Sequence, residues 1–137
     1  MMPEHANNYG NVHGGLIVKL ADEAAAICAM RHARRPTVTV AIDSMSFKSP
    51  VYTGQLVSIS ASINYVGKTS MEVGVKVMAE HPIEGTVTHT NSAYFVFVAL
   101  DDQGKPCRVP PLLLQDDEER RRWREGEERQ RKRRAER

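Results

Sequence analysis

The sequence predicts an α+β fold in which a curved antiparallel sheet wraps around one long helix. Residues 14–33 carry apolar positions at helical spacing and many alanines, whereas the chain after Pro36 alternates with a period of two. One helix followed by four strands leaves that helix as the only element able to cover the apolar face of the sheet. We therefore expect the helix to be central and largely buried.

The helix is expected to begin at the glycine pair Gly14-Gly15 and to end before Pro36, which breaks helical structure. Glycines at a helix start allow close approach of another group and leave the first amides exposed. The apolar positions that recur at helical spacing are Leu16, Leu20, Ala24, Ile27 and Cys28.

Four strands are expected after the helix, at residues 37–47, 57–65, 71–77 and 93–100. The first is rich in β-branched residues, and the second and third alternate apolar with other residues. The last is almost wholly apolar after a polar start at 88–92, so it is expected in the middle of the sheet. Proline, glycine and polar residues predict turns at 48–54, 67–69, 81–85 and 101–104.

Length and charge divide the chain into one domain at residues 1–115 and a charged helical tail at 116–137. The 137 residues and 41% hydrophobic content suit one core. The tail has ten basic and eight acidic side chains and the body nine of each, which accounts for the net charge of +2. Because acidic residues are mixed into the tail, we expect a solvated helix rather than a nucleic-acid contact. Its single aromatic residue, Trp123, is expected to attach it to the body or to a neighbouring subunit.

Several kinds of protein are not indicated. No apolar run approaches the roughly 20 residues that span a bilayer, and residues 1–10 lack the features of a signal peptide, so we expect no membrane partner and a cytoplasmic location. Cys28 and Cys107 are expected to be free thiols. The five histidines lack metal-ligand spacing, so no metal site is predicted.

Asp22 is the leading candidate for chemistry. It lies on the helix among small apolar residues, where a carboxylate costs free energy unless partners or a shifted pKa compensate. The neighbouring Glu23 is expected on the surface with Lys19. On its own, Asp22 is equally compatible with a carboxylate bonded to a strand or placed at a subunit interface.

A set of short motifs in residues 3–114 resembles the hotdog-fold acyl-CoA thioesterases of the cytosolic, brain-type acyl-CoA hydrolase family. The first is the run from Asn7 through Gly14-Gly15 to Asp22 and Glu23. The others are Val38-Thr39-Val40, Phe47 to Val51 with Gly54, Gly67-Lys68-Thr69-Ser70, Ala93-Tyr94-Phe95 and Pro106 to Pro110. Many ordered matches are more specific than any single motif.

The resemblance implies a hotdog fold, a homodimer with active sites at its interface, and assembly into a hexamer as a trimer of dimers. It implies hydrolysis of fatty acyl-CoA to free fatty acid and coenzyme A, and no separate cofactor, because coenzyme A is part of the substrate and product. In the family, residues matching Asn7 and Asp22 are both required and are thought to come from different subunits.

This chemistry suits the residues. Asp22 is expected to act as general base or nucleophile, with Asn7 orienting the water or the carbonyl. The amides of Gly14 and Gly15, at the positive end of the helix dipole, are the expected oxyanion donors. His13 is a competing base, but a histidine beside a glycine pair is expected to be structural.

The segment Gly67-Lys68-Thr69-Ser70 matches the family's stretch near the nucleotide, although an ordinary hairpin turn explains it equally well. Two other functions stay open: a hotdog module that binds acyl-CoA without cleaving it, and, less favoured, a hotdog dehydratase. Family members usually have a strand before the asparagine loop. Residues 1–6 leave little room for it, so either this strand is absent or the chain start is truncated.

Overall fold

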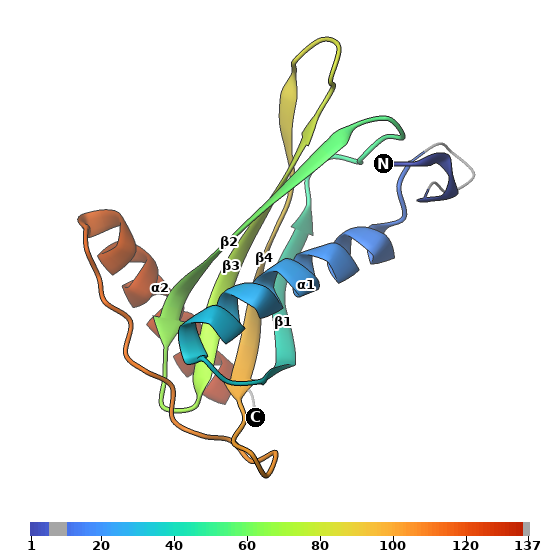
Figure 1. Ribbon diagram of the computed structural model, residues 1–137. Coiled ribbons are helices and arrows are strands. Elements are labelled where there is room, and N and C mark those ends of the chain that lie inside the picture. Colours follow the sequence, from blue (N-terminus) through green and yellow to red (C-terminus); the bar gives the residue numbers. More distant parts are fainter. Residues whose placement is uncertain (6–10, 136–137) are drawn as a thin grey trace.

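The computed structural model describes residues 1–5 and 11–135 (Figure 1). Its two helices and four strands follow the predicted order. The elements are a 3-10 turn η1 (Pro3–His5), α1 (Gly14–Ala33), β1 (Thr37–Phe47), β2 (Leu56–Val66), β3 (Ser70–Glu80), β4 (Val87–Ala99) and α2 (Asp117–Ala135). No helix in the described part of the chain has the length and apolar character needed to cross a membrane.

The four strands form one antiparallel sheet in the order β1-β4-β3-β2. The predicted central position of the apolar strand is confirmed, since β4 lies between β1 and β3. The predicted turns at 67–69 and 81–85 join β2 to β3 and β3 to β4 as hairpins. The sheet therefore has two edges, β1 and β2.

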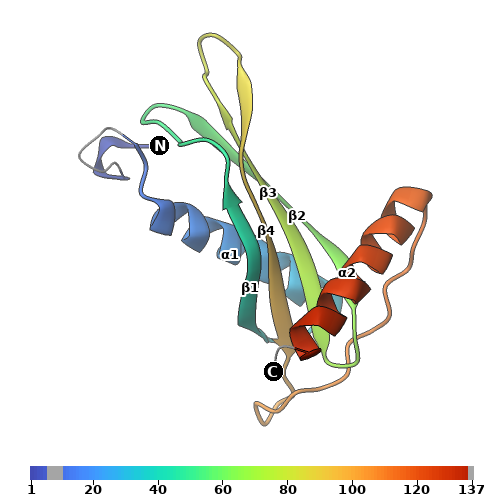
Figure 2. The same ribbon diagram turned by 180° about the vertical axis from the view of Figure 1, so that it is seen from behind.

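The two helices cover opposite faces of the sheet (Figures 1 and 2). Helix α1 buries a stripe that repeats every fourth residue, Ile17, Ala21, Ala25, Ala29 and Ala33, against a core that includes Met71, Val73, Phe95 and Phe97. Of the apolar positions that recur at helical spacing, Leu16 and Cys28 pack beside this stripe, whereas Ile27 is 50% exposed. Small alanines let the helix backbone approach the sheet closely, so their stripe faces inward and the larger residues lie at its sides.

Strand β1 contains a bulge at Val40. Thr39 pairs with Phe97 and Ala41 with Val96, so two steps along β1 match one step along β4. Residues four positions apart in a regular strand share a face. Here Thr39 bonds to α1, whereas Asp43 bonds to Arg133 of α2 on the opposite face, at 3.0 Å. The bulge makes β1 a strand that serves both helices.

Helix α2 forms as predicted, but one side of it is packed against the sheet rather than solvated. Glu72 of β3 has a fully buried side chain, and Arg129 and Arg133 donate to it at 2.9 and 3.2 Å. The ring of Trp123 meets Tyr65 edge to face, with centroids 5.0 Å apart. A buried carboxylate needs such partners, which fixes the position of the helix along the sheet.

Candidate functional site

Asp22 lies half-buried on α1, directly after Ala21 of the buried stripe. Its Oδ1 accepts a hydrogen bond from Thr39 Oγ1 of β1 at 2.8 Å. Among the described residues, Oδ2 has no hydrogen-bond partner and stays available to a ligand or water. An oriented carboxylate with one free oxygen is suited to take a proton from water.

The other candidates near Asp22 have different surroundings. Glu23 is exposed on the outer side of α1. His13 is also exposed, precedes the first turn of α1, and makes no capping bond with its side chain. Of the three groups, Asp22 alone combines partial burial with a hydroxyl partner.

Thr39 is a site residue that was quoted within a motif but not assigned a role. The only signal in the sequence was the motif Val38-Thr39-Val40, because Asp22 and Thr39 are 17 positions apart and belong to different elements. The bulge at Val40, which turns the two halves of β1 toward different helices, has no signature in the pattern of residues.

Asn7 lies outside the described residues. The chain that follows it is held at Asn11 and Val12. Asn11 forms an isolated bridge with Tyr52, and the amide of Val12 donates to the carbonyl of Val51 at 2.7 Å. Helix α1 begins two residues later.

The glycine pair opens α1 with free space around it. Leu16 is the first residue of the helix whose N–H finds an acceptor in the described part of the chain, the carbonyl of His13 at 3.1 Å. An added Cβ would touch nothing within 4 Å at Gly15, and at Gly14 it would only contact the ring of Phe47. The exposed amides are therefore open to a ligand.

Asp22 and the glycine amides do not meet within one chain. Gly14 and Gly15 precede Asp22 by eight and seven residues, which corresponds to about 12 and 10 Å along a helix. A single thioester carbonyl is too small to contact both ends of that distance. The chain therefore presents two halves of a site at different levels of α1.

The segment Gly67-Lys68-Thr69-Ser70 forms the tight β2–β3 hairpin, in which the amide of Gly67 donates to the carbonyl of Ser70 at 2.8 Å. A Cβ at Gly67 would lie 3.0 Å from Ser70 Oγ, which favours glycine there. The amide of Val109 donates to the Lys68 carbonyl at 2.9 Å. This bond places Arg108 and Lys68 around one depression of about 280 Å³.

Arg108 is the second residue without a predicted role. Lys68 and Arg108 place two cations at this depression, and a ligand that carries phosphate groups requires such cations. The hairpin lies level with Thr39, since Thr39 and Met71 both pair with Phe97. Two strand spacings, about 10 Å, separate these two positions.

In the part of the chain that the structure describes, no three His, Cys, Asp or Glu side chains gather as a metal site requires. Both cysteines are free thiols, as predicted. Burial raises the pKa of the Cys28 thiol, and the nearby Arg31 charge and a hydrogen bond to the Ile63 backbone only partly oppose this shift.

Curated relatives resemble most of this chain. It is 44% identical over 110 residues to protein VdlD of Helicobacter pylori, covering 80% of this chain and 63% of that protein. Identity is 39% to YkhA of Bacillus subtilis, named an uncharacterized acyl-CoA thioester hydrolase, over 80% of this chain and 64% of that protein. The cytosolic acyl coenzyme A thioester hydrolase of Rattus norvegicus is 34% identical to this chain, and the match covers 93% of this chain and 34% of that protein. The chain thus spans just under two thirds of the length of the first two relatives.

Solved structures share its architecture. An apo-hexameric acyl-CoA thioesterase superposes with a TM-score of 0.94 at 34% identity, covering 99% of this chain and 87% of that one. An acyl-CoA hydrolase of Staphylococcus aureus was solved with butyryl coenzyme A and coenzyme A. It superposes with a TM-score of 0.91 at 34% identity, covering 99% of this chain and 83% of that one. The predicted hotdog fold is confirmed. The sequence profile of the thioesterase superfamily matches residues 9–86, and the chain belongs to this superfamily.

Proposed function

We propose that this chain hydrolyses fatty acyl-CoA to free fatty acid and coenzyme A. The observation that carries the proposal is the contact between Asp22 and Thr39, which orients a half-buried carboxylate and leaves one oxygen free. Names of relatives and solved neighbours, which include acyl-CoA thioester hydrolases, support the substrate class.

Solved variants of the S. aureus hydrolase add support for the residues. Three of them replace an asparagine, an aspartate and a threonine, and these three positions are separated by 15 and 17 residues in that chain. Asn7, Asp22 and Thr39 have the same two separations here. We infer that these three residues form the corresponding set.

In the reaction we infer, Asp22 takes a proton from a water molecule as the water oxygen bonds to the thioester carbonyl carbon. Thr39 donates to Asp22 and holds the attacking geometry, and Asn7 orients the water or the carbonyl. The amides of Gly14 and Gly15 stabilise the oxyanion. The carbon–sulfur bond then breaks, and coenzyme A leaves as the thiol after gaining a proton. No separate cofactor is needed.

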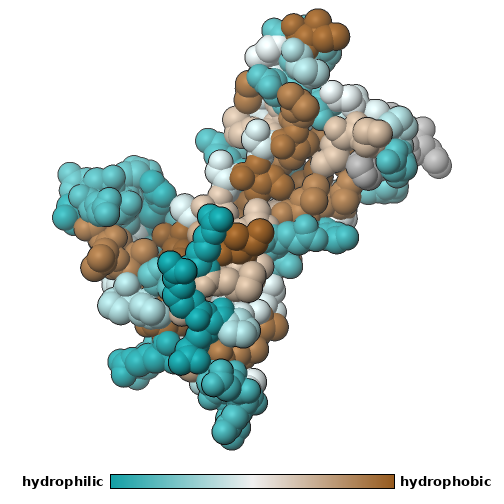
Figure 3. Space-filling model, in the orientation of Figure 1, coloured by the Kyte–Doolittle hydropathy of each residue, from teal (hydrophilic) through white to brown (hydrophobic). Residues whose placement is uncertain are grey.

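The axial distance between Asp22 and the glycine pair supports a site shared by two copies. The edge strand β1 exposes Val38, Val40 and Ile42, each more than 40% accessible, and an exposed apolar edge is a template for pairing with another chain. Apolar side chains also gather on the α1 side of the molecule (Figure 3). We infer a homodimer at least, and a hexamer built as a trimer of dimers; two of the solved neighbours are hexameric.

Substrate orientation follows from the cations. Lys68 and Arg108, with the hydroxyls of Thr69 and Ser70, are inferred to hold the phosphates of coenzyme A at the β2–β3 hairpin. The acyl chain then lies toward the apolar dimer interface. No nucleic acid or membrane partner is proposed. The cytosolic relative supports a cytoplasmic location.

The test is release of free thiol from palmitoyl-CoA and shorter acyl-CoAs by wild type, Asp22→Asn and the control Glu23→Gln. Loss of a general base is expected to lower kcat about 100-fold or more in Asp22→Asn, with folding intact and Glu23→Gln active. Absence of thiol release from every acyl-CoA would overturn the proposal. Tight acyl-CoA binding that survives Asp22→Asn without turnover would instead support a sensor.

A further inference from the structure

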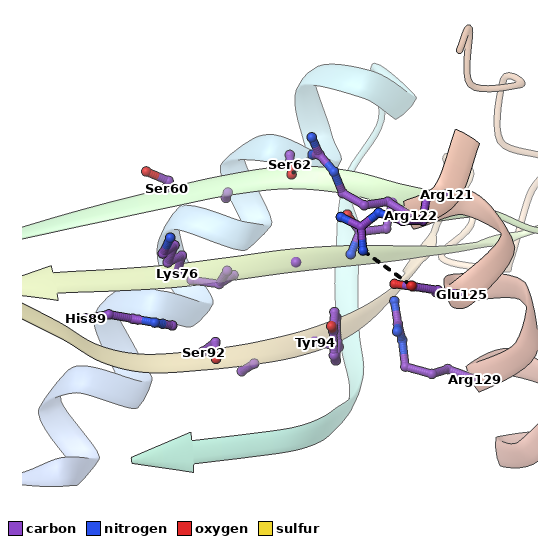
Figure 4. A pocket seen from close by; sticks show the side chains of 15 residues that line it. Ser60, Ser62, Lys76, His89, Ser92, Tyr94, Arg121, Arg122, Glu125 and Arg129 are labelled. Carbon is purple, nitrogen blue, oxygen red and sulfur yellow. Dashed lines mark hydrogen bonds and ion pairs between the residues drawn. The ribbon is translucent and has the colours of Figure 1, made fainter. Parts of the chain in front are cut away.

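A second concave site lies on the face of the sheet opposite Asp22. It is a groove of about 510 Å³ between strands β2, β3 and β4 and the N-terminal half of α2 (Figure 4). Of the residues proposed for thioester hydrolysis, none that the structure describes lines it. We refer to it as the outer groove.

Strand register places hydroxyl groups on both sides of a lysine in this groove. Lys76 of β3 pairs with Ser60 of β2 and with Ser92 of β4. Paired residues of neighbouring strands point to the same face. The three side chains therefore form a row across the sheet, and Figure 4 shows Lys76 between the two serines.

The next row of the sheet makes room for the side chain of Asn64. Ser62 of β2 pairs with Gly74 of β3, which has no side chain to fill the space. A Cβ at Gly74 would lie 2.6 Å from Asn64 Nδ2, so glycine is required for Asn64 to reach Glu72 at 3.3 Å. The side chain of Asn64 therefore occupies the space above Gly74 and gives the groove a polar floor at this point.

The cations of the groove outnumber its acids. Of the acidic side chains in the described ranges 1–5 and 11–135, only Glu125 lines it, and Arg121 pairs with Glu125 at 3.3 Å. Arg129 is occupied by the buried Glu72. Lys76 has no ion pair with any described residue.

Arg122 is the second cation with binding capacity to spare. Its guanidinium donates weakly to Ser62 Oγ at 3.4 Å, and its nearest carboxylate, Glu118, is 3.6 Å from Nε. That Nε atom is buried and makes no hydrogen bond. The Arg122 side chain as a whole is 37% exposed and lines the groove, so its terminal nitrogens can donate charge-assisted hydrogen bonds to an oxyanion there.

We propose that the outer groove binds a small anion with two linked phosphoryl groups, between Lys76 and Arg122. Ser62 follows Ser60 by two residues, about 7 Å along the strand, so Lys76 and Arg122 lie in neighbouring rows of the groove and can each hold one phosphoryl group of a diphosphate. Ser60, Ser62 and Ser92 supply hydroxyl donors. The groove volume lies within the usual range for small-molecule sites.

Binding has a mechanical consequence, because the ligand joins two elements. Lys76 belongs to the sheet and Arg122 to α2, so a bound diphosphate adds a bridge to the Glu72 contacts. Ligand that binds only the folded chain raises the unfolding temperature. This site is independent of the proposed hydrolysis and is separated from Asp22 by the sheet.

Inorganic pyrophosphate is the probe, measured on the full chain by calorimetry and by thermal unfolding. We expect one pyrophosphate per chain, at least tenfold weaker binding in Lys76→Ala and in Arg122→Ala, and near wild-type binding in Lys76→Arg. Lys105→Ala, which removes an exposed lysine outside the groove, should bind normally. Acyl-CoA hydrolysis should be unchanged in Lys76→Ala.

Three results would overturn the proposal. The first is absence of pyrophosphate binding at millimolar concentration, and the second is equal binding in wild type, Lys76→Ala and Arg122→Ala. The third is competition between pyrophosphate and acyl-CoA that Lys76→Ala abolishes, which would make the groove part of the substrate site. The variant Ser60→Trp fills the outer groove with a large side chain. If this variant dissociates the assembly and the wild type does not bind pyrophosphate, the groove is a contact between copies of the chain.

Discussion

At the scale of single residues, the role proposed for Asp22 depends on one neighbour. A carboxylate on a helix exposed to water rotates freely, whereas the Thr39 hydroxyl fixes one oxygen of Asp22 at 2.8 Å and leaves the other available. Hydrogen bonds to a charged group are among the stronger ones in proteins, at about 1.5–3 kcal/mol. The proposed activity therefore depends on a strand residue that itself does no chemistry on the substrate.

Thr39→Val tests this dependence. The change keeps the shape of the side chain but removes the donor to Asp22, so kcat for acyl-CoA hydrolysis is expected to fall about 10- to 100-fold with KM nearly unchanged. Steady-state kinetics and thermal unfolding provide the measurement. Thr37→Val is the matched control, because Thr37 Oγ1 is buried without a partner and its loss should not lower activity. Equal losses in both variants would contradict the role of Thr39.

Cys28 yields a prediction about pH. Its pKa is raised above the ordinary value of 9.0, chiefly by burial, so the thiol is neutral at pH 7 and should react slowly with iodoacetamide. In a Cys107→Ser background, the alkylation rate should still be rising at pH 9.0. The neutral thiol contributes stability below that pH, and this contribution is lost as pH rises through the folded-state pKa. A rate plateau below pH 9 would refute the prediction.

At the scale of elements, sequence patterns predicted boundaries better than orientations. The glycine pair and Pro36 bracket α1, and the predicted limits of α1 and β1 match the structure. The inward face of α1 was missed, because both stripes contain apolar residues and only contact with the sheet selects the alanines. The attachment of α2 to the body through Trp123, one of the two expected alternatives, is confirmed by the contact with Tyr65. The pairing of Glu72 with Arg129 was missed, because these residues are 57 positions apart.

Gly126 makes the attachment of α2 testable. Alanine normally stabilises a helix by about 1 kcal/mol relative to glycine. Here a Cβ would lie 2.7 Å from Tyr65 Cβ, so Gly126→Ala should force α2 away from the sheet and lower the unfolding temperature by several degrees. Trp123 fluorescence should shift to longer wavelength. Glu127→Ala provides a control for helix propensity alone, and equal stability in the two variants would contradict the contact.

At the scale of the whole molecule, the proposed site is divided into two halves that lie apart within one chain. Asp22 and Thr39 lie toward the β2–β3 hairpin end of the sheet, whereas Gly14 lies beside Phe47 at the other end of β1. Pairing two copies in antiparallel fashion along β1 would bring each end of one chain toward the opposite end of the other. Assembly and activity should therefore be lost together.

Ile42→Lys on the edge of β1 is the corresponding variant. A charge in the centre of the pairing edge should yield monomers with normal circular dichroism and at least 100-fold lower thioesterase activity. Light scattering and the thiol-release assay measure the two effects. Ile83→Lys is the control, because Ile83 lies at the β3–β4 turn and is 90% exposed. Active monomers of Ile42→Lys would show that one chain suffices.

The bulge at Val40 also sets a rule for how this sequence can change. The one extra residue in β1 between Thr39 and Asp43 makes their side chains point to opposite faces of the sheet. Replacing that residue by another that is compatible with a β-strand will preserve this arrangement. Deleting the residue would leave Thr39 and Asp43 three positions apart in a regular strand, which also places them on opposite faces. Keeping the residue but losing the bulge would instead turn Thr39 and Asp43 to the same face, so one of the two helices would lose its contact. Relatives can therefore differ here by replacement or by loss of this one residue, but not by straightening of the strand with its length unchanged.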